Sequence, residues 1–260
     1  MPIRIGNHRS GKPKVVSGRW LRYHRPILPL LVAQTKNARM ATAPHEISLS
    51  DVRQQMFSAV ICDALDSIGY TNQSPRTPLR QLTSGEMIVG RCRTTLWADM
   101  FHEDPQPYEL ELKAVDSCGL DDVLIAAAGG SMRSGIWGEL LTTAVLKGGC
   151  VGAIVDGAIR DVEKIRQLGF PVIARGTCLY DSKNRQRVVD VDVPVEIDSV
   201  VFSPGDLVVA DEDGTVVVPR KVEAKVLSLA WNKVHDENKV RAAMAGGMKA
   251  TDAFHKYGVL

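Results

Sequence analysis

The stretch that decides the fold is Gly149-Cys-Val-Gly-Ala-Ile-Val-Asp-Gly-Ala-Ile-Arg-Asp161. Its apolar run, 151–155, is typical of a buried strand, and Arg160 and Asp161 stand where the next helix should begin. Between them, Asp156-Gly157 predicts a tight turn that the Asp156 side chain holds by hydrogen bonds. The stretch therefore predicts a buried strand that delivers a cation and a carboxylate to one edge of a sheet.

Strands and helices alternate on both sides of this stretch. The hydrophobic periodicity predicts strands at 87–97, 122–128, 150–155 and 171–174, with helices at 108–115, 139–146 and 161–168. Short strands at 193–197, 200–202, 206–210 and 215–218 follow, separated by Pro-Gly and Asp-Gly turns. Further helices are predicted at 48–65, with a second helical phrase at 58–66, and at 222–244 and 251–257.

This order predicts one α/β domain with a mixed sheet over residues 45–260, carrying C-terminal helices at 222–257. The long C-terminal helix is polar over 232–241, so we expect it to protrude, either against a partner subunit or as a solvated arm. Residues 1–44 form a basic leader without Asp or Glu, which we expect to be poorly ordered. The leader is either a transit-like segment or an upstream extension before Met40.

Composition narrows the class of protein. With 260 residues, 45% hydrophobic and 24% charged, and a net charge of +2, the chain is an ordinary globular one, and nucleic-acid binding is not expected. Its apolar runs are too short for a membrane span. The five cysteines lack a C-x-x-C pair, which predicts free thiols and a reducing, cytoplasmic location.

Two strand-to-helix junctions carry the candidate chemistry. At the first, Gly138 lets the backbone approach a ligand closely, and the N–H groups of Leu140 and Leu141 can hold a carboxylate. Glu139 beside them either contributes to a metal site or only complements the helix dipole. At the second junction, Arg160 can grip a carboxylate or keto acid.

Asp161, next to Arg160, can coordinate a hard divalent ion. Its alternative is a surface ion pair in which Asp161 caps the helix. Because successive strands of an α/β sheet end at one edge, both junctions predict a single pocket. By contrast, the loop at 102–104 (His-Glu-Asp) is expected to be solvated, and Glu237 and Arg241 to form an i, i+4 salt bridge.

At these motifs the chain resembles the RraA-like family, which includes class II 4-hydroxy-4-methyl-2-oxoglutarate/4-carboxy-4-hydroxy-2-oxoadipate aldolases and RNase E regulators. The matching motifs are Trp137-Gly-Glu-Leu-Leu141, Val155-Asp-Gly-Ala-Ile-Arg-Asp161 and Pro204-Gly-Asp-Leu-Val-Val-Ala-Asp211. The resemblance extends from about residue 58 to the C-terminal helix. It implies a β/β/α sandwich, assembled as a homotrimer or a dimer of trimers.

For function, the resemblance implies a lyase: a metal-dependent aldolase that releases pyruvate and also decarboxylates oxaloacetate. Arg160 would contact the pyruvyl unit, and Asp161 would face Mg²⁺ or Mn²⁺. The amides of Leu140 and Leu141 would hold the pyruvyl carboxylate. Glu139 would act on the metal shell through water, although the aldolases commonly have the shorter Asp there.

The family also supplies a glutamate from a neighbouring subunit, which Glu237 matches. Two alternatives stay open at this point: a non-catalytic regulator that binds an RNase or helicase, and a related lyase acting on a sugar-acid derivative. A full set of Glu139, Arg160, Asp161 and Glu237 favours the enzyme, because a regulator need not retain a metal shell.

Overall fold

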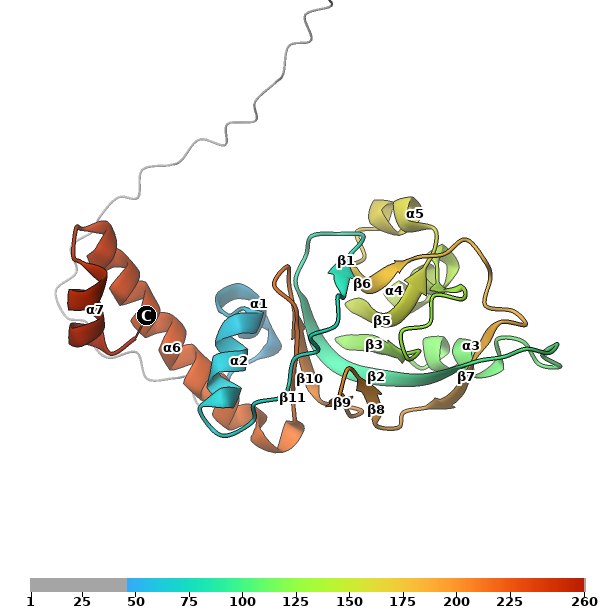
Figure 1. Cartoon of the computed structure of the whole chain (residues 1–260), viewed down its shortest axis with the longest axis horizontal. Coiled ribbons are helices and arrows are strands. Elements are labelled where there is room, and N and C mark those ends of the chain that lie inside the picture. The colour runs from blue at the N-terminus through green and yellow to red at the C-terminus, as the bar shows by residue number, and fades with distance from the viewer. Residues whose placement is uncertain (1–45, 260) are drawn as a thin grey trace, which may run out of the picture. The chain divides into compact units, whose positions relative to one another are not determined.

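The computed structural model describes residues 46–259 (Figure 1). The predicted basic leader lies outside these residues. The helices are α1 (Leu49–Gln55), α2 (Ser58–Asp66), α3 (Glu109–Asp116), α4 (Glu139–Gly148), α5 (Val162–Gln167), the 3-10 turn η1 (Arg220–Val222), α6 (Glu223–Ala245) and α7 (Ala250–Tyr257). The strands are β1 (Arg80–Gln81), β2 (Ile88–Asp99), β3 (Asp122–Ala127), β4 (Gly135–Trp137), β5 (Gly152–Ile159), β6 (Val172–Thr177), β7 (Gln186–Val191), β8 (Val195–Ile197), β9 (Val200–Phe202), β10 (Leu207–Ala210) and β11 (Thr215–Val218).

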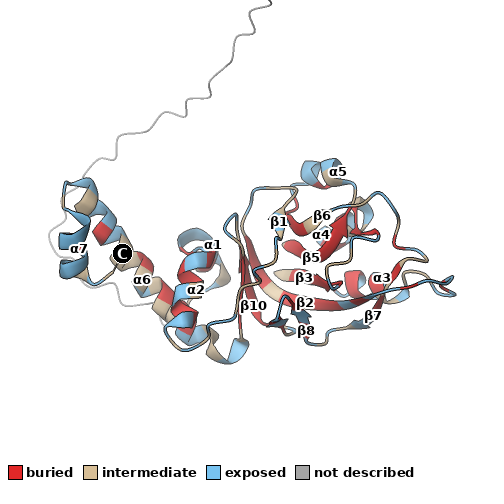
Figure 2. Cartoon of the chain, viewed as in Figure 1, coloured by how far each residue is buried: buried red, intermediate tan, exposed pale blue. Residues whose placement is uncertain are grey.

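Most strands form one mixed sheet in the order β1-β6-β5-β3-β2-β10-β11, to which β4 adds beside β5 and β7 beside β2. The central pairs β2–β3, β3–β5 and β5–β6 are parallel, and β10 and β11 extend the sheet antiparallel. Parallel central strands are buried on both faces, and β5 is buried along its whole length (Figure 2). The predicted mixed sheet is therefore confirmed.

Alternation along β3 shows the layers on either face of the sheet. Val123 and Ile125 belong to an apolar cluster with residues of the small β8–β9 sheet, such as Phe202. Leu124 and Ala126 belong to a second cluster, with residues of α3, α4 and α5. Because successive side chains of a strand point to opposite faces, the main sheet lies between a small sheet and a helical layer. This is the predicted β/β/α sandwich.

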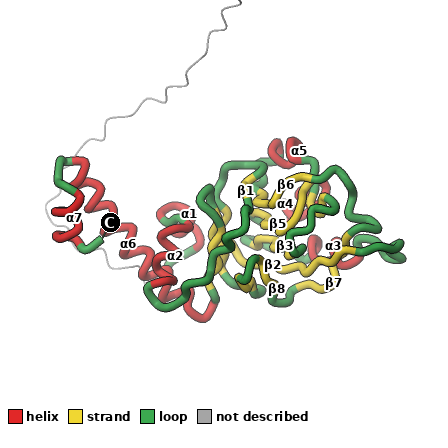
Figure 3. Tube along the Cα trace, viewed as in Figure 1, coloured by secondary structure: helices red, strands yellow, loops and turns green. Residues whose placement is uncertain are grey.

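A third apolar cluster joins α1, α2 and the first half of α6 to β10 and β11. In α6 the buried side chains Val226, Leu227 and Ala230 recur at helical spacing and face this cluster. α7 folds back against α6 (Figure 1). Figure 3 separates this helical part from the strand-rich part. The predicted C-terminal helix is thus present, with its first half anchored.

The turn predicted at Asp156-Gly157 is wrong. β5 continues through both residues to Ile159, with a register shift against β6 between Val155 and Ala158. Asp156 is only 2% exposed, and its charge is compensated by an ion pair with Arg175 and a hydrogen bond from the Gly130 N–H at 3.0 Å. A carboxylate with such partners can occupy a strand interior.

Two other differences from the predicted elements appear. The helix predicted at 48–65 is two helices, because the chain is extended at Met56 and Phe57. Strands β4 and β7 were not predicted, since each is short or interrupted in its apolar pattern.

Among the described residues, none of the helices combines the length and the apolar character that a membrane span needs.

Gly90→Ala is expected to destabilise the fold, because a Cβ there would lie 2.2 Å from the Asp121 carbonyl oxygen and 2.8 Å from Val123 Cγ2. Overpacking of this kind costs about 1–3 kcal/mol or more. Gly85→Ala is the matched control, since nothing lies within 4 Å of its added Cβ. Urea denaturation of both variants measures the difference; equal stability would contradict the tight packing of β2 on β3.

Candidate functional site

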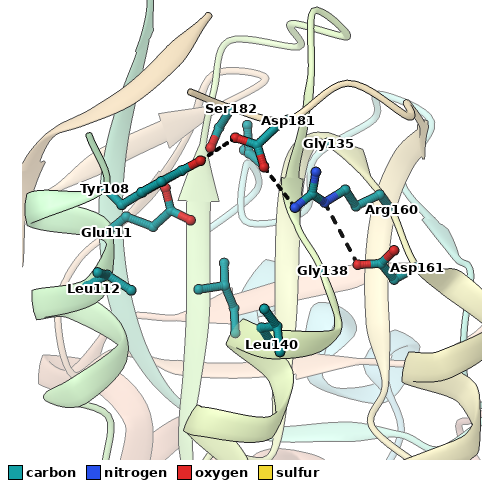
Figure 4. Close-up of a pocket in the computed structure, with 12 residues that line it drawn as sticks. Tyr108, Glu111, Leu112, Gly135, Gly138, Leu140, Arg160, Asp161, Asp181 and Ser182 are labelled. Carbon is teal, nitrogen blue, oxygen red and sulfur yellow. Dashed lines mark hydrogen bonds and ion pairs between the residues drawn. The ribbon is translucent and has the colours of Figure 1, made fainter. Parts of the chain in front are cut away.

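A cavity of about 300 Å³ lies between α3, the start of α4, the ends of β4 and β5, and the loop after β6 (Figure 4). Its position at the carboxyl ends of parallel strands is where α/β sheets bind ligands. Its lining combines an apolar wall with a small set of charged groups. The lining residues are Tyr108, Glu111, Leu112, Gly135, Ile136, Gly138, Leu140, Leu141, Arg160, Asp161, Asp181 and Ser182.

Two glycines allow the two predicted junctions to touch. A Cβ on Gly138 would lie 2.9 Å from Asp161 Oδ2 and 3.4 Å from Arg160 Cγ. A Cβ on Gly135 would lie 2.6 Å from the Cys178 carbonyl oxygen and 3.0 Å from Arg160 Cβ. At Gly135 the contact is with backbone, so the chain has no room for a side chain there. At Gly138 a Cβ would push the Asp161 carboxylate away from its position beside α4.

The start of α4 presents backbone donors to the cavity. Leu140 and Leu141 are the second and third residues of α4, so their N–H groups lack helical carbonyl partners. The Trp137 carbonyl oxygen accepts a hydrogen bond from the Arg160 N–H at 2.8 Å, which ties the end of β4 to β5. The free N–H groups and the helix dipole make this rim suited to an anion.

Arg160 stands at the end of β5 between two carboxylates. Its Nη2 lies 2.8 Å from Asp181 Oδ2, and its Nε lies 3.8 Å from Asp161 Oδ2 (Figure 4). The guanidinium is about one-third exposed, so it is held in place yet open to the cavity. A fixed, partly exposed guanidinium beside free amides can bind a carboxylate or a keto acid.

Asp161 does not cap its own helix. It occupies the N-cap position of α5 with a left-handed backbone (φ 56°), and its side chain makes no capping bond. Instead, its Oδ2 accepts a hydrogen bond from the Glu139 N–H at 3.3 Å. The alternative in which Asp161 only caps α5 is therefore wrong. The strained backbone directs the carboxylate toward the first turn of α4.

Asp181 and Tyr108 are pocket residues that the sequence did not reveal. The Tyr108 hydroxyl donates a hydrogen bond of 2.6 Å to Asp181 Oδ1, and the Lys183 N–H donates another of 2.8 Å. Burial raises the pKa of Asp181, but these hydrogen bonds and the Arg160 charge outweigh it, so that the pKa is lowered. Burial and the Asp181 carboxylate raise the pKa of Tyr108 to about 12.

Glu111 is the third missed residue. It lies in α3 with 8% exposure, and its carboxyl faces the cavity (Figure 4). Burial, followed by the charge of Asp181, raises the pKa of Glu111 to about 8, although Arg160 acts in the opposite direction. The sequence did contain a signal, because Glu111 shares the buried helix face with Ala114 and Val115 at positions i+3 and i+4.

Two predicted site residues lie apart from the cavity lining. Glu139 is half-buried, and its Oε1 accepts a hydrogen bond from Thr143 at 3.1 Å. Glu237 lies on α6, 3.9 Å from the Lys233 ammonium, beside a separate groove. Arg241 donates to Asn238, so the predicted Glu237–Arg241 salt bridge is replaced by other pairs. Within the described chain, Glu237 is not brought to the pocket.

The loop at 102–104 is not wholly solvated as predicted. Asp104 is buried and pairs with Arg187 at 3.2 Å. The same carboxylate accepts a hydrogen bond from the Gln106 N–H at 3.0 Å. Asp104 therefore holds the loop against β7.

The carboxylates near the cavity can be compared with the ligands that a divalent metal ion needs. Residues 46–259 contain no group of three or more His, Cys, Asp or Glu side chains arranged to enclose a metal. Asp161 offers one carboxylate, 38% exposed, beside the anion-binding rim. A single carboxylate fits Mg²⁺, which keeps several waters and often shares its coordination with a bound substrate. The residues therefore fit a hydrated ion that a substrate helps to hold.

The layered sheet defines an α/β sandwich, and its cavity combines free helix amides with a guanidinium, as suits an anion. The chain belongs to the RraA-like family: the family model described as Aldolase/RraA matches residues 58–217. This match confirms the resemblance that the motifs predicted. The family itself includes proteins of more than one function, so the match defines the fold and lineage.

Relatives and solved structures agree with this assignment. The chain is 32% identical over 194 residues to a Halalkalibacterium halodurans protein named "Putative 4-hydroxy-4-methyl-2-oxoglutarate aldolase", covering 75% of this chain and 87% of that protein. It is 28% identical over 200 residues to Protein DlpA of Legionella pneumophila, covering 77% of this chain but 32% of DlpA, so it spans about a third of that protein's length.

The structure also resembles Streptomyces coelicolor RraAS2, described as an unusual member of the RNase ES inhibitor RraA protein family. The TM-score is 0.66 at 29% identity, covering 77% of this chain and 100% of RraAS2. The comparisons thus include both an aldolase name and an inhibitor name.

The buried Glu111 predicts a stability effect that depends on pH. Its carboxyl titrates near 8 when folded and near 4.5 when unfolded, so between these values the folded state binds more protons. Stability then falls as pH rises, by at most about 1.4 kcal/mol per pH unit from this group. Glu111→Gln should therefore gain stability relative to wild type as pH rises from about 5 to 8.

Thermal melts of both proteins at several pH values measure this gain. Glu109→Gln is the matched control, since Glu109 is exposed on the same helix. A constant difference between Glu111→Gln and wild type across the window would contradict the raised pKa.

Proposed function

We propose that the protein is a lyase that releases pyruvate: a divalent-metal-dependent aldolase that cleaves 4-hydroxy-2-oxo diacids and also decarboxylates oxaloacetate. The observation that carries the proposal is the meeting of Arg160, Asp161 and the free amides of α4 at one cavity. The aldolase name of the Halalkalibacterium relative supports it. Among the proposed substrates, the shared part is the pyruvyl unit.

Different groups of the cavity bind different parts of a 2-oxo acid. The carboxylate of the substrate accepts hydrogen bonds from the N–H groups of Leu140 and Leu141, with Gly138 leaving room beside them. The keto oxygen lies toward Arg160. Asp161 would be the direct ligand of Mg²⁺ or Mn²⁺, and Glu139 would act through water. A bound divalent ion would serve as a Lewis acid for the negative charge that develops on this oxygen.

Arg160 stabilises the transition state, because retro-aldol cleavage and β-decarboxylation both place negative charge on the former keto oxygen. Asp181 holds the guanidinium at 2.8 Å and is itself held by Tyr108, so Arg160 is oriented before substrate arrives. A pre-oriented group need not reorganise during the reaction. A water held by Glu139 or by Glu237 of a neighbouring subunit removes the proton of the substrate hydroxyl.

The assembly proposed with this function is a homotrimer or a dimer of trimers. Glu237 lies on α6 beside Val240 and Met244, and none of the residues that line the cavity of its own chain belongs to α6. Exposed apolar side chains stand at and near the cavity, including Leu140 at 76% and Leu179 at 93%. A neighbouring subunit would cover such side chains and bring its Glu237 to the site.

The second candidate is a regulator that binds an RNase or a helicase through its surface. The likeness to RraAS2 supports this candidate. In that case the cavity residues would not matter for function.

A lyase acting on a sugar-acid derivative is a further variant of the enzyme proposal, and it differs only in the part of the substrate beyond the pyruvyl unit. Screening 2-oxo diacids and sugar acids for pyruvate release separates the two substrate classes.

Arg160→Ala is expected to lower pyruvate release from oxaloacetate by about 100-fold or more, as for other groups that stabilise an oxyanion. The assay couples pyruvate to lactate dehydrogenase in the presence of Mg²⁺. Arg166→Ala is the matched control, because Arg166 is an exposed arginine of α5 that pairs with Glu163. Equal rates for Arg160→Ala and wild type would refute the enzyme proposal.

In the same assay, EDTA should stop the wild-type reaction, and added Mg²⁺ or Mn²⁺ should restore it. A wild-type protein that releases no pyruvate from any 2-oxo diacid or sugar acid, yet binds an RNase or helicase equally well with Asp161→Asn, would favour the regulator.

A site shared between subunits predicts complementation between two inactive variants. Arg160→Ala and Glu237→Ala each remove one half of the site, so each alone should be nearly inactive. After unfolding, mixing and refolding together in equal amounts, random assembly should return about a quarter of the wild-type sites. If the mixture stays as inactive as its components, the two residues do not meet across a subunit interface.

A further inference from the structure

Glu111 occupies the wall of the cavity that faces Arg160. Its carboxyl points into the space between α3 and the end of β5 (Figure 4). Arg160, the cation across that space, pairs with Asp181 at 2.8 Å. Glu111 thus lies in the pocket as a buried acid whose nearest opposite charge is engaged elsewhere.

This environment keeps a proton on Glu111 at neutral pH. Burial is the largest cause and raises the pKa of its carboxyl. The Asp181 charge raises this pKa further, while the Arg160 charge and a hydrogen bond with the Ser182 side chain lower it, which leaves a pKa of about 8. A buried carboxylic acid in this state can donate a proton during a reaction. The geometry of the cavity makes that proton available to a ligand, because Glu111 is part of the lining.

The other acidic hydrogens of the lining are already in use. The Tyr108 hydroxyl donates to Asp181 at 2.6 Å, and the Asp181 charge raises the pKa of Tyr108 to about 12. The Arg160 guanidinium pairs with Asp181 and stays charged in proteins. Among the residues that line the cavity, Glu111 is therefore the acid best suited to give up a proton near pH 7.

The proposed function has a step that such a donor would serve. When the C–C bond of the substrate breaks, its electron pair remains on the pyruvyl fragment, which becomes an enolate. Carbon 3 of this enolate must gain a proton to become pyruvate, and without a donor in the cavity it must take that proton from water. We propose that Glu111 is the catalytic acid that protonates carbon 3 of the pyruvate enolate, an inference that rests on the proposed function.

The step balances in both reactions. The O–H bond of Glu111 breaks, its proton forms the new C–H bond at carbon 3, and the enolate oxygen regains its C=O bond. In the aldol reaction, the proton taken from the substrate hydroxyl passes to solvent; in decarboxylation, CO₂ leaves in place of the carbonyl product. Glu111 is left as a carboxylate and takes a proton from water after pyruvate leaves.

The test measures proton delivery apart from bond cleavage. In the first assay, NMR in D₂O follows the exchange of the pyruvate methyl hydrogens for deuterium. This exchange requires proton transfer to and from carbon 3, which is the proposed step. In the second assay, absorbance follows the disappearance of oxaloacetate, which reports bond cleavage. Glu111→Gln keeps the size and neutrality of the protonated acid but lacks its transferable proton. We expect exchange to fall by about 100-fold or more, and oxaloacetate consumption to fall much less.

Glu111→Asp keeps a carboxylic acid and should recover part of the exchange. Glu109→Gln is the matched control: Glu109 is exposed on the same helix, so this variant should exchange at the wild-type rate. Circular dichroism checks that each variant is folded. If Glu111→Gln exchanged the methyl hydrogens at the wild-type rate, the inference would be overturned. Equal losses of exchange and of cleavage would also overturn it, because they would indicate a structural role for Glu111. If wild type neither cleaves oxaloacetate nor exchanges pyruvate, the proposed function itself fails and this inference falls with it.

Discussion

The close contact between the start of α4 and the end of β5 is the constraint on which the site depends. Gly138 and Gly135 allow it, because a side chain at either position would collide with Arg160, with Asp161 or with the backbone at Cys178. The contact places backbone donors, a guanidinium and a carboxylate at the rim of one cavity. Each group alone is common on protein surfaces, and their convergence is what suggests a ligand.

A second layer of interactions sets the charge of the cavity. Asp181 holds Arg160, Tyr108 holds Asp181, and the resulting negative charge helps to keep Glu111 neutral. One ion pair therefore influences both walls: it fixes the Arg160 guanidinium on one wall, and its Asp181 carboxylate raises the pKa of Glu111 on the other. Groups with such different environments can take different roles in one reaction.

The family match establishes the lineage of the chain, and the cavity bears on which function of that family the chain has. The match over residues 58–217 establishes the lineage, in which aldolase and inhibitor names both occur. The cavity favours the enzyme among these functions, because a surface regulator has no need for a buried acid opposite an oriented arginine. The part of the substrate beyond the pyruvyl unit would meet Leu112 and the side of α3, a region that the motifs do not describe.

The sequence by itself determined the alternating elements, the mixed α/β class, the family, and the two junctions at Gly138-Glu139 and Arg160-Asp161. These follow from local periodicity and from glycines near helix ends, which a single chain displays directly. Only the tertiary structure decided that Asp156 lies inside a strand, because its partners Arg175 and Gly130 are distant in sequence. It also brought Asp181 and Glu111 to the pocket, since ion pairing and burial depend on which segments meet in space rather than on their order along the chain.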